Sequence, residues 1–304
     1  MLIASPLPHT PDTPLPAGWW RHPLTRLVCF LVLLAAGAVT VGLALASLGL
    51  GGPWLMAVEL VSVVLAYLLV TMGLEGRRPP VELDPRRAGG LLYGLTLGAF
   101  GMALVFGLCW ALGLREVTGT NPRAPLVQPV LMMGLTAGVA EELVFRGILF
   151  RLVERGLGTW GAAGLSGLLF GLVHLGNPAG TWWGAVAIAL EAGVMFALLY
   201  ALTRSLWVVI GVHAAWNVVQ GPVLGSAVSG ATANGEGLVV SYPVGPELLS
   251  GGTFGLEASL VSVLLWCAFS AWLVTQLRPS GRVVLPWWRR RALERSWQEQ
   301  SVRP

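Results

Sequence analysis

Long apolar runs separated by short polar breaks dominate this chain of 304 residues. A bilayer core of about 30 Å is crossed by roughly 20 helical residues. Runs of about that length occupy 27–50, 53–74, 89–114, 126–150, 158–176, 181–203, 205–222 and 256–277. Only 11% of the residues are charged, too few to cover the surface of a soluble protein of this size. We therefore predict an all-α integral membrane protein, a bundle of about eight transmembrane helices.

The basic residues indicate how these runs are oriented in the membrane. All nineteen are arginines, and sixteen of them lie before the first run, after the second, fourth, sixth or eighth run, or in the C-terminal tail. If those segments are cytoplasmic, the excess of arginine follows the positive-inside rule. The sequence thus predicts a multi-pass protein of the cell membrane with both termini in the cytoplasm. The net charge of +4 is explained by orientation, and we expect no nucleic-acid partner.

Composition divides the chain into three parts. Residues 1–26 are rich in proline and are expected to form a disordered cytoplasmic tail. Residues 27–278 form the membrane domain, and 279–304 form a basic cytoplasmic tail, which is either a short amphipathic helix on the inner surface or a solvated tail. The Gly-rich segment 221–255 contains no arginine and is expected to be a flexible external loop that either caps a cavity or links two helices.

Ionisable side chains inside the apolar runs indicate function, because a charge at the bilayer centre costs several kcal/mol unless it is paired or hydrated. Glu142 and Arg146 are four residues apart, so on a helix they share one face and can neutralise each other. Glu141 points about 100° away and is left for another role. The alternative is a purely structural charge cluster that holds the bundle together. The polar residues in the runs are Glu59, Glu141, Glu142, Arg146, His174, Glu191, His213 and Asn217.

One glutamate and two histidines from different runs supply the parts needed to activate a water. Glu141, His174 and His213 lie about 15, 21 and 14 Å from the predicted cytoplasmic ends of their helices, so they can meet near the midplane. A carboxylate can take a proton from water that an imidazole orients, while a second imidazole and an amide stabilise the oxyanion formed at a carbonyl. The same three residues are candidate zinc ligands, and the sequence leaves both versions open. The bundle would then enclose a polar catalytic cavity.

These residues resemble the motifs of the CPBP family of intramembrane proteases, also called the Abi or CAAX-protease family. The resemblance covers about residues 126–222 and implies that Glu141 and His174 activate the water. It also implies that His213 and Asn217 form the oxyanion site and that Glu142 and Arg146 orient it. The family is described both as metalloproteases and as metal-independent glutamate proteases. Its three motifs occur in family order on three predicted helices, as Glu141, Glu142 and Arg146, then Phe170 and His174, then His213 and Asn217.

The resemblance implies an intramembrane endopeptidase acting on a membrane-embedded or lipidated peptide. We expect Phe170, Glu191 and Asn177 to be candidate substrate-binding residues, although hydrogen bonding within the bundle also explains Glu191. Two other hypotheses compete: a non-catalytic immunity or scaffold protein that keeps the motifs for packing, and a proton-coupled transporter. Transporters of the latter kind usually contain repeated halves, which the sequence does not show.

Overall fold

The fold is seen in a computed structural model, which describes residues 22–49 and 53–301. The predicted disordered tail lies almost entirely outside these residues. Helices and strands are α1 (Pro23–Ser47), α2 (Pro53–Leu68), α3 (Gly89–Ala111), β1 (Arg115–Thr120), α4 (Val127–Pro129), α5 (Gly138–Glu142), α6 (Arg151–Val173), α7 (Trp182–Ile188), α8 (Met195–Thr203), α9 (Leu206–Val218), β2 (Val239–Pro243), α10 (Glu247–Ser250), α11 (Leu260–Leu277) and α12 (Trp287–Ser301). Wider π-helical turns extend α2 (Leu69–Leu74) and α9 (Val219–Val223), and join α4 to α5 (Val130–Ala137), α5 to α6 (Leu143–Phe150) and α7 to α8 (Ala189–Val194).

The structure confirms an all-α membrane protein. Within the described residues, seven helices are long and apolar enough to cross a membrane. One of them, Val127–Gly176, joins two of the predicted runs, but it breaks at Gly158, which has φ 74° and ψ 176°. The two arms fold back on each other, since Phe145 on the first contacts Phe170 on the second with ring centroids 4.9 Å apart. The predicted break between 150 and 158 is therefore a reversal of the chain.

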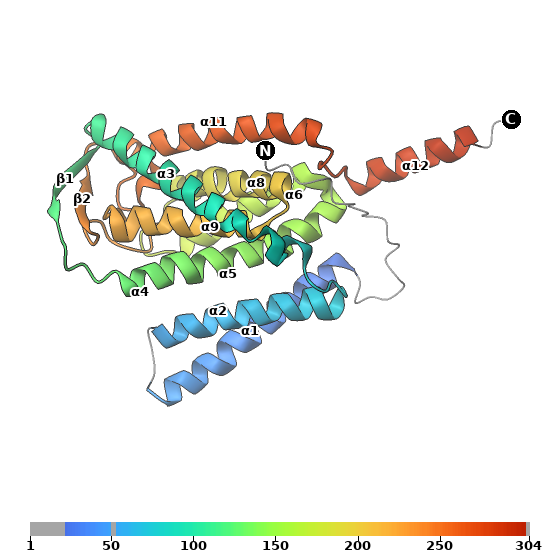
Figure 1. The fold of residues 1–304 in the computed structure, drawn as a ribbon, viewed down its shortest axis with the longest axis horizontal. Helices are drawn as coiled ribbons and strands as arrows, with labels where there is room; N and C mark the ends of the chain where they lie inside the picture. The colour runs from blue at the N-terminus through green and yellow to red at the C-terminus, as the bar shows by residue number, and fades with distance from the viewer. Residues whose placement is uncertain (1–21, 50–52, 302–304) are drawn as a thin grey trace.

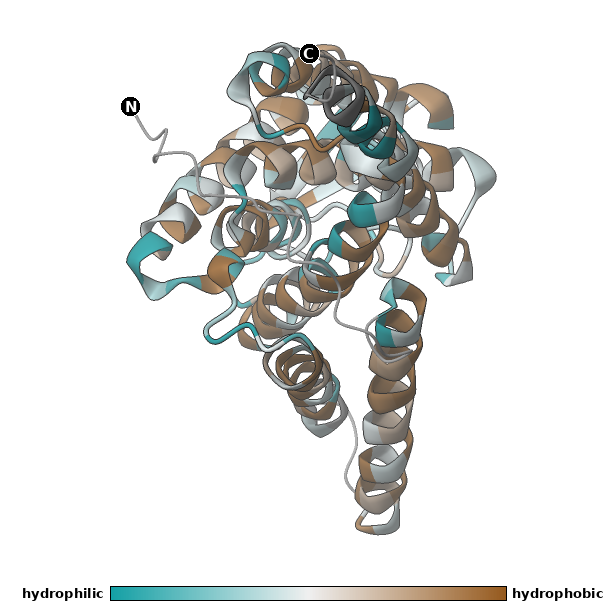
Figure 2. Ribbon diagram, turned by 90° about the vertical axis from the view of Figure 1, so that its right-hand side faces the viewer, coloured by the Kyte–Doolittle hydropathy of each residue, from teal (hydrophilic) through white to brown (hydrophobic). Residues whose placement is uncertain are grey.

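Hydropathy follows the membrane pattern expected from the sequence (Figure 2). Hydrophobic residues cover the long helices, whereas hydrophilic residues gather at helix ends and along α12. α12 projects from the bundle at one end, and α1 and α2 form a pair that diverges from the other helices at the opposite end (Figure 1). The predicted basic tail thus contains a helix.

α3 and α9 pack backbone to backbone, and this contact positions the helix that carries His213. A Cβ atom placed on Gly94 would lie 2.1 Å from the carbonyl oxygen of Val208, and one on Gly98 would lie 2.2 Å from that of Val212. Small residues four apart allow such close approach of membrane helices. Side chains at these two positions would push the helices apart.

Arginines bind the helix ends at the predicted cytoplasmic side. α8 ends where Arg204 adopts a left-handed conformation, with φ 51°. Arg204 donates two hydrogen bonds, of 2.5 and 2.7 Å, to the two carboxylate oxygens of Glu154 on α6. Arg87 donates to the carbonyl oxygens of Thr203 and Arg204, so cations lie at the negative end of the α8 dipole.

The Gly-rich segment 221–255 after α9 is a folded cap, not the flexible loop expected from its composition. β2 within it pairs antiparallel with β1, and the buried Arg115 side chain donates to Ser241 and to the backbone of Gly225. Burial lowers the pKa of Arg115 to about 10. Burial likewise raises the pKa of Glu257 to about 7, although hydrogen bonds from Ser229 act in the opposite direction. Composition suggested mobility because glycine is abundant, but the polar contacts that order the segment are long-range.

Candidate active site

The two adjacent glutamates lie on the short helix α5, between two π-helical turns. These wider turns shift the register of side chains along the helix, and they are frequent at functional sites. Glu142 is fully buried, whereas 31% of the Glu141 side chain is exposed. One glutamate therefore faces the core and its neighbour faces a space that solvent or substrate can reach.

Glu141 faces both intramembrane histidines. Its Oε2 atom lies 3.9 Å from Nε2 of His174 and 4.0 Å from Nε2 of His213. This buried oxygen has no hydrogen-bond partner among the residues that the structure describes. Separations near 4 Å are too long for direct hydrogen bonds, but they suit one water bound between the groups at about 2.8 Å from each. The structure thus brings the three predicted residues together at distances that one water can bridge.

Glu142, Arg146 and His213 form a second, tightly hydrogen-bonded set. Oε1 of Glu142 accepts a hydrogen bond of 2.8 Å from Nη1 of Arg146, the pairing that their spacing predicted. The same oxygen lies 2.8 Å from Nδ1 of His213. Because the carboxylate accepts there, Nδ1 carries a hydrogen and the ring is held with Nε2 toward Glu141. Glu142 therefore orients His213.

Arg146 is completely buried, and its surroundings explain how the guanidinium is tolerated. Its Nη2 atom donates to the carbonyl oxygens of Ala192 and Gly193, at 2.5 and 3.0 Å. The guanidinium carbon also lies 4.8 Å from the ring centroid of Phe170 and 5.4 Å from that of Phe196. Carbonyl oxygens, a carboxylate and aromatic faces together replace water around the cation.

His174 lies at the end of α6, in a 3-10 turn that spans His174–Gly176. Its Nδ1 atom lies 2.6 Å from the carbonyl oxygen of Phe170. A carbonyl can only accept, so Nδ1 carries the hydrogen and Nε2 of the neutral ring has a free lone pair toward Glu141. Phe170, a predicted substrate contact, also packs its ring 4.7 Å from that of His174. The backbone carbonyl one helical turn before the histidine thus sets its tautomer.

The remaining predicted residues lie in different places. Asn217 is buried and donates from Nδ2 to the carbonyl oxygen of Met133 at 3.2 Å, which leaves its second amide hydrogen free of that bond. Asn177 follows His174 and donates to the carbonyl oxygen of Ser229 in the cap. Glu191 accepts a hydrogen bond of 2.7 Å from Ser262 on α11. No hydrogen bond joins Glu191 to a motif residue in the described part of the chain.

The donor set does not fit zinc as it is placed. Within residues 22–49 and 53–301, no group of three or more His, Cys, Asp or Glu side chains is arranged to hold a metal ion. Ligands that share a tetrahedral zinc lie roughly 3.4 Å apart. The distances from Glu141 to His174 and to His213 are 3.9 and 4.0 Å.

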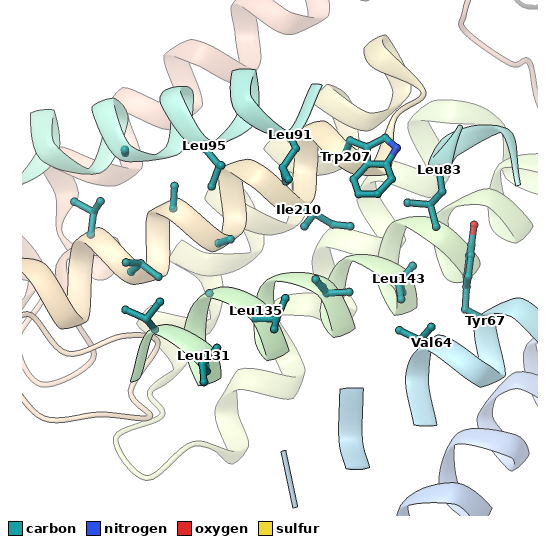
Figure 3. A pocket seen from close by; sticks show the side chains of 18 of the residues that line it. Val64, Tyr67, Leu83, Leu91, Leu95, Leu131, Leu135, Leu143, Trp207 and Ile210 are labelled. Atoms are coloured by element: carbon teal, nitrogen blue, oxygen red, sulfur yellow. The ribbon is translucent and has the colours of Figure 1, made fainter. Parts of the chain in front are cut away.

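An apolar groove of about 710 Å³ lies beside the site, between α2, α3, α9 and the α4–α5 segment (Figure 3). Leu91 and Leu95 from α3 face Leu131 and Leu135 across the groove, and Ile210 of α9 lies between them. This groove could not be predicted from the sequence, because the apolar side chains that line it are equally typical of a helix face in contact with lipid. Gly94 and Gly98 of α3 and Gly211 of α9 are the local signals that these two helices pack closely, since a Cβ on each would meet the backbone of the other helix.

Comparisons with known proteins bear on the same part of the chain. Residues 123–219 match a family model for Rce1-like proteins, described as type II CAAX prenyl endopeptidase Rce1-like. Neither the curated proteins nor the solved structures that were searched gave a match. All seven motif residues lie inside the matched segment, which is similar to the family that the motifs resemble.

Proposed function

We propose that this protein is an intramembrane endopeptidase that hydrolyses a peptide bond of a membrane-associated or lipid-anchored protein. The family match supports a CAAX-type endopeptidase in general terms. The observation that carries the specific proposal is the geometry of Glu141. Its unpartnered Oε2 atom faces Nε2 of His174 and of His213 at about equal distances.

In this mechanism, a water bound between Glu141 and His174 is the nucleophile. The water donates one hydrogen to Glu141 and the other to Nε2 of His174, which directs an oxygen lone pair at the scissile carbonyl. As the oxygen–carbon bond forms, a proton passes to Glu141. The same proton then passes to the leaving nitrogen as the carbon–nitrogen bond breaks, so the products are a carboxylic acid and an amine.

The oxyanion that forms on the carbonyl needs hydrogen-bond donors, and His213 and Asn217 are the proposed ones. Nδ1 of His213 already donates to Glu142, so its Nε2 donates only when the ring is an imidazolium. The second amide hydrogen of Asn217 completes the pair, while the bond to Met133 holds the side chain in place.

The surroundings suit a substrate that lies in the bilayer. Glu141 is partly exposed, and the apolar groove occupies the outer face of the helix segment that carries it. A lipid chain attached to the substrate would pack against these apolar side chains by van der Waals contact, since its CH₂ groups are already out of water in the bilayer. These features support a lipid-anchored or membrane-embedded peptide as the substrate class.

The proposal is tested by cleavage of a library of membrane-embedded and lipid-anchored peptides by the purified protein. Glu141→Gln keeps the shape of the side chain but removes the base, so we expect a rate about 10²- to 10⁴-fold lower. His174→Ala should lose activity to a similar extent. Glu116→Gln, an identical change on the exposed strand β1, is the matched control and should retain the wild-type rate.

Chelator is added in parallel, so that inhibition would indicate a metal requirement. Equal rates for wild type, Glu141→Gln and His174→Ala, with all three proteins folded, would refute the proposed mechanism. Absence of cleavage by folded wild-type protein across the library would instead favour a non-catalytic membrane protein.

A further inference from the structure

Glu59 on α2 is an ionisable residue inside a membrane-spanning helix that the mechanism does not use. It shares a helix face with Val63, Ala66 and Val70, which follow at positions four, seven and eleven. Those three residues are 2%, 2% and 0% exposed, so this face of α2 is turned toward the protein. Glu59 itself is exposed on the same face. Glu59 therefore lies on the protein-facing side of α2, just before the part of the helix that the rest of the protein buries.

The depth of Glu59 in the bundle matches that of Glu141. The ring of Tyr67 on α2 lies against Gly147, where an added Cβ would approach it to 2.8 Å. α2 and the α4–α5 segment run in the same direction (Figure 1). Glu59 precedes Tyr67 by eight residues and Glu141 precedes Gly147 by six, so at 1.5 Å per residue the two glutamates differ in depth by about 3 Å.

The electrostatics agree with this placement. α2 packs against α5, the helix that carries Glu141, and the two like charges repel each other. Glu142 is neutralised by Arg146, and within the described residues no ion pair involves Glu59. A negative charge in an apolar surrounding attracts a cation strongly and disfavours another anion. Glu59 is thus an exposed carboxylate without an ion pair, on a helix packed against the one that carries Glu141.

We propose that Glu59 determines the charge preference of the site, favouring a substrate with a basic side chain next to the cleaved bond and disfavouring an acidic one. This inference rests on the proposed peptidase function. In it, Glu59 is a specificity-determining residue that contacts the substrate side chain, and it takes no part in the bond-breaking step. Its negative charge, and not its size, is the property that matters.

The test uses fluorescent lipid-anchored peptides that are identical except for Lys, Gln or Glu at one position flanking the scissile bond. For wild-type protein in detergent micelles, we expect cleavage of the Lys peptide to exceed that of the Glu peptide about fivefold, the upper end for one exposed charge pair. Glu59→Gln should reduce this ratio to below about twofold while the Gln peptide is still cleaved, and Glu59→Lys should invert it. Val61→Gln, an amide on the exposed opposite face of α2, is the matched control and should keep the wild-type ratio.

Binding of the same peptides to a Glu141→Gln background, measured by fluorescence anisotropy, separates this inference from the proposed function. If the wild type cleaves nothing, the peptidase proposal fails, yet the binding ratio of Lys to Glu peptides and its loss in Glu59→Gln still test the role of Glu59. Ratios that are the same in wild type, Glu59→Gln and Glu59→Lys would overturn the inference. Thermal unfolding of each variant checks that it is folded.

Discussion

Substitution of Gly98 by alanine should displace the helix that carries His213. The added Cβ would lie 2.2 Å from the carbonyl oxygen of Val212, the residue before the histidine. Carbon and oxygen atoms in contact between helices lie about 3.3 Å apart, so α3 and α9 must separate locally by about 1 Å. The neighbour is backbone, which cannot move aside as a flexible side chain can.

Gly98→Ala is expected to lower both the stability of the protein and the rate of peptide cleavage. Overpacking of this kind destabilises by about 1–3 kcal/mol, partly offset by the roughly 1 kcal/mol by which alanine favours a helix over glycine. A displacement of about 1 Å at a catalytic group lowers the rate by up to about 10²-fold. Gly98→Ala should therefore unfold at a lower temperature than wild type and cleave peptide more slowly even where it is folded.

Gly107→Ala, on the same helix α3, is the control, because an added Cβ at this position meets no atom within 4 Å. It gains only the helix propensity and should be as stable as wild type or slightly more so. Thermal unfolding in detergent and peptide cleavage are measured for both variants. If Gly98→Ala and Gly107→Ala unfold at the same temperature and cleave at the same rate, the backbone contact between α3 and α9 does not position the site.

Three further predictions concern buried charges. Burial raises the pKa of Glu257 from 4.5 to about 7. Its contribution to stability is therefore complete below about pH 4.5 and is lost as pH rises through 7, by roughly 3 kcal/mol in total. Thermal unfolding from pH 5 to 8.5 should show this decline in stability, and Glu257→Gln should flatten it. Glu142→Gln leaves the buried Arg146 without its counter-ion and should destabilise by about 3–5 kcal/mol, whereas adding Arg146→Met should recover part of that loss. Glu154→Gln removes the carboxylate bound by Arg204 and should lower stability by about 3 kcal/mol, with an unchanged unfolding temperature contradicting this.

Local patterns in the chain predicted much of the site. The spacing of Glu142 and Arg146 predicted an i, i+4 ion pair, and the structure has it at 2.8 Å. The Phe170 to His174 spacing likewise produces a one-turn contact, the hydrogen bond between Nδ1 and the Phe170 carbonyl. Such features follow from the helical repeat alone, so neighbours in sequence are sufficient to predict them.

Features that join distant segments were not predictable in this way. The bond between Asn217 and Met133, the order of the Gly-rich cap and the apolar groove each depend on which helices pack side by side. The family resemblance implied that Asn217 belongs to the oxyanion site, and in the structure one of its amide hydrogens is already bonded to a backbone carbonyl. The sequence of a membrane helix does not distinguish an apolar residue that faces lipid from one that lines a groove.

Apolar run length and three short motifs were sufficient to indicate a multi-helix membrane protein and to identify a glutamate and two histidines as candidate reactive groups. Those properties are local, because the bilayer thickness and the helical repeat act on each segment separately. The distances of 3.9 and 4.0 Å that place Glu141 between His174 and His213 arise only when the chain reverses at Gly158 and α9 packs against α3. Tertiary packing decided them, because a contact between residues more than thirty positions apart depends on every helix that lies between them.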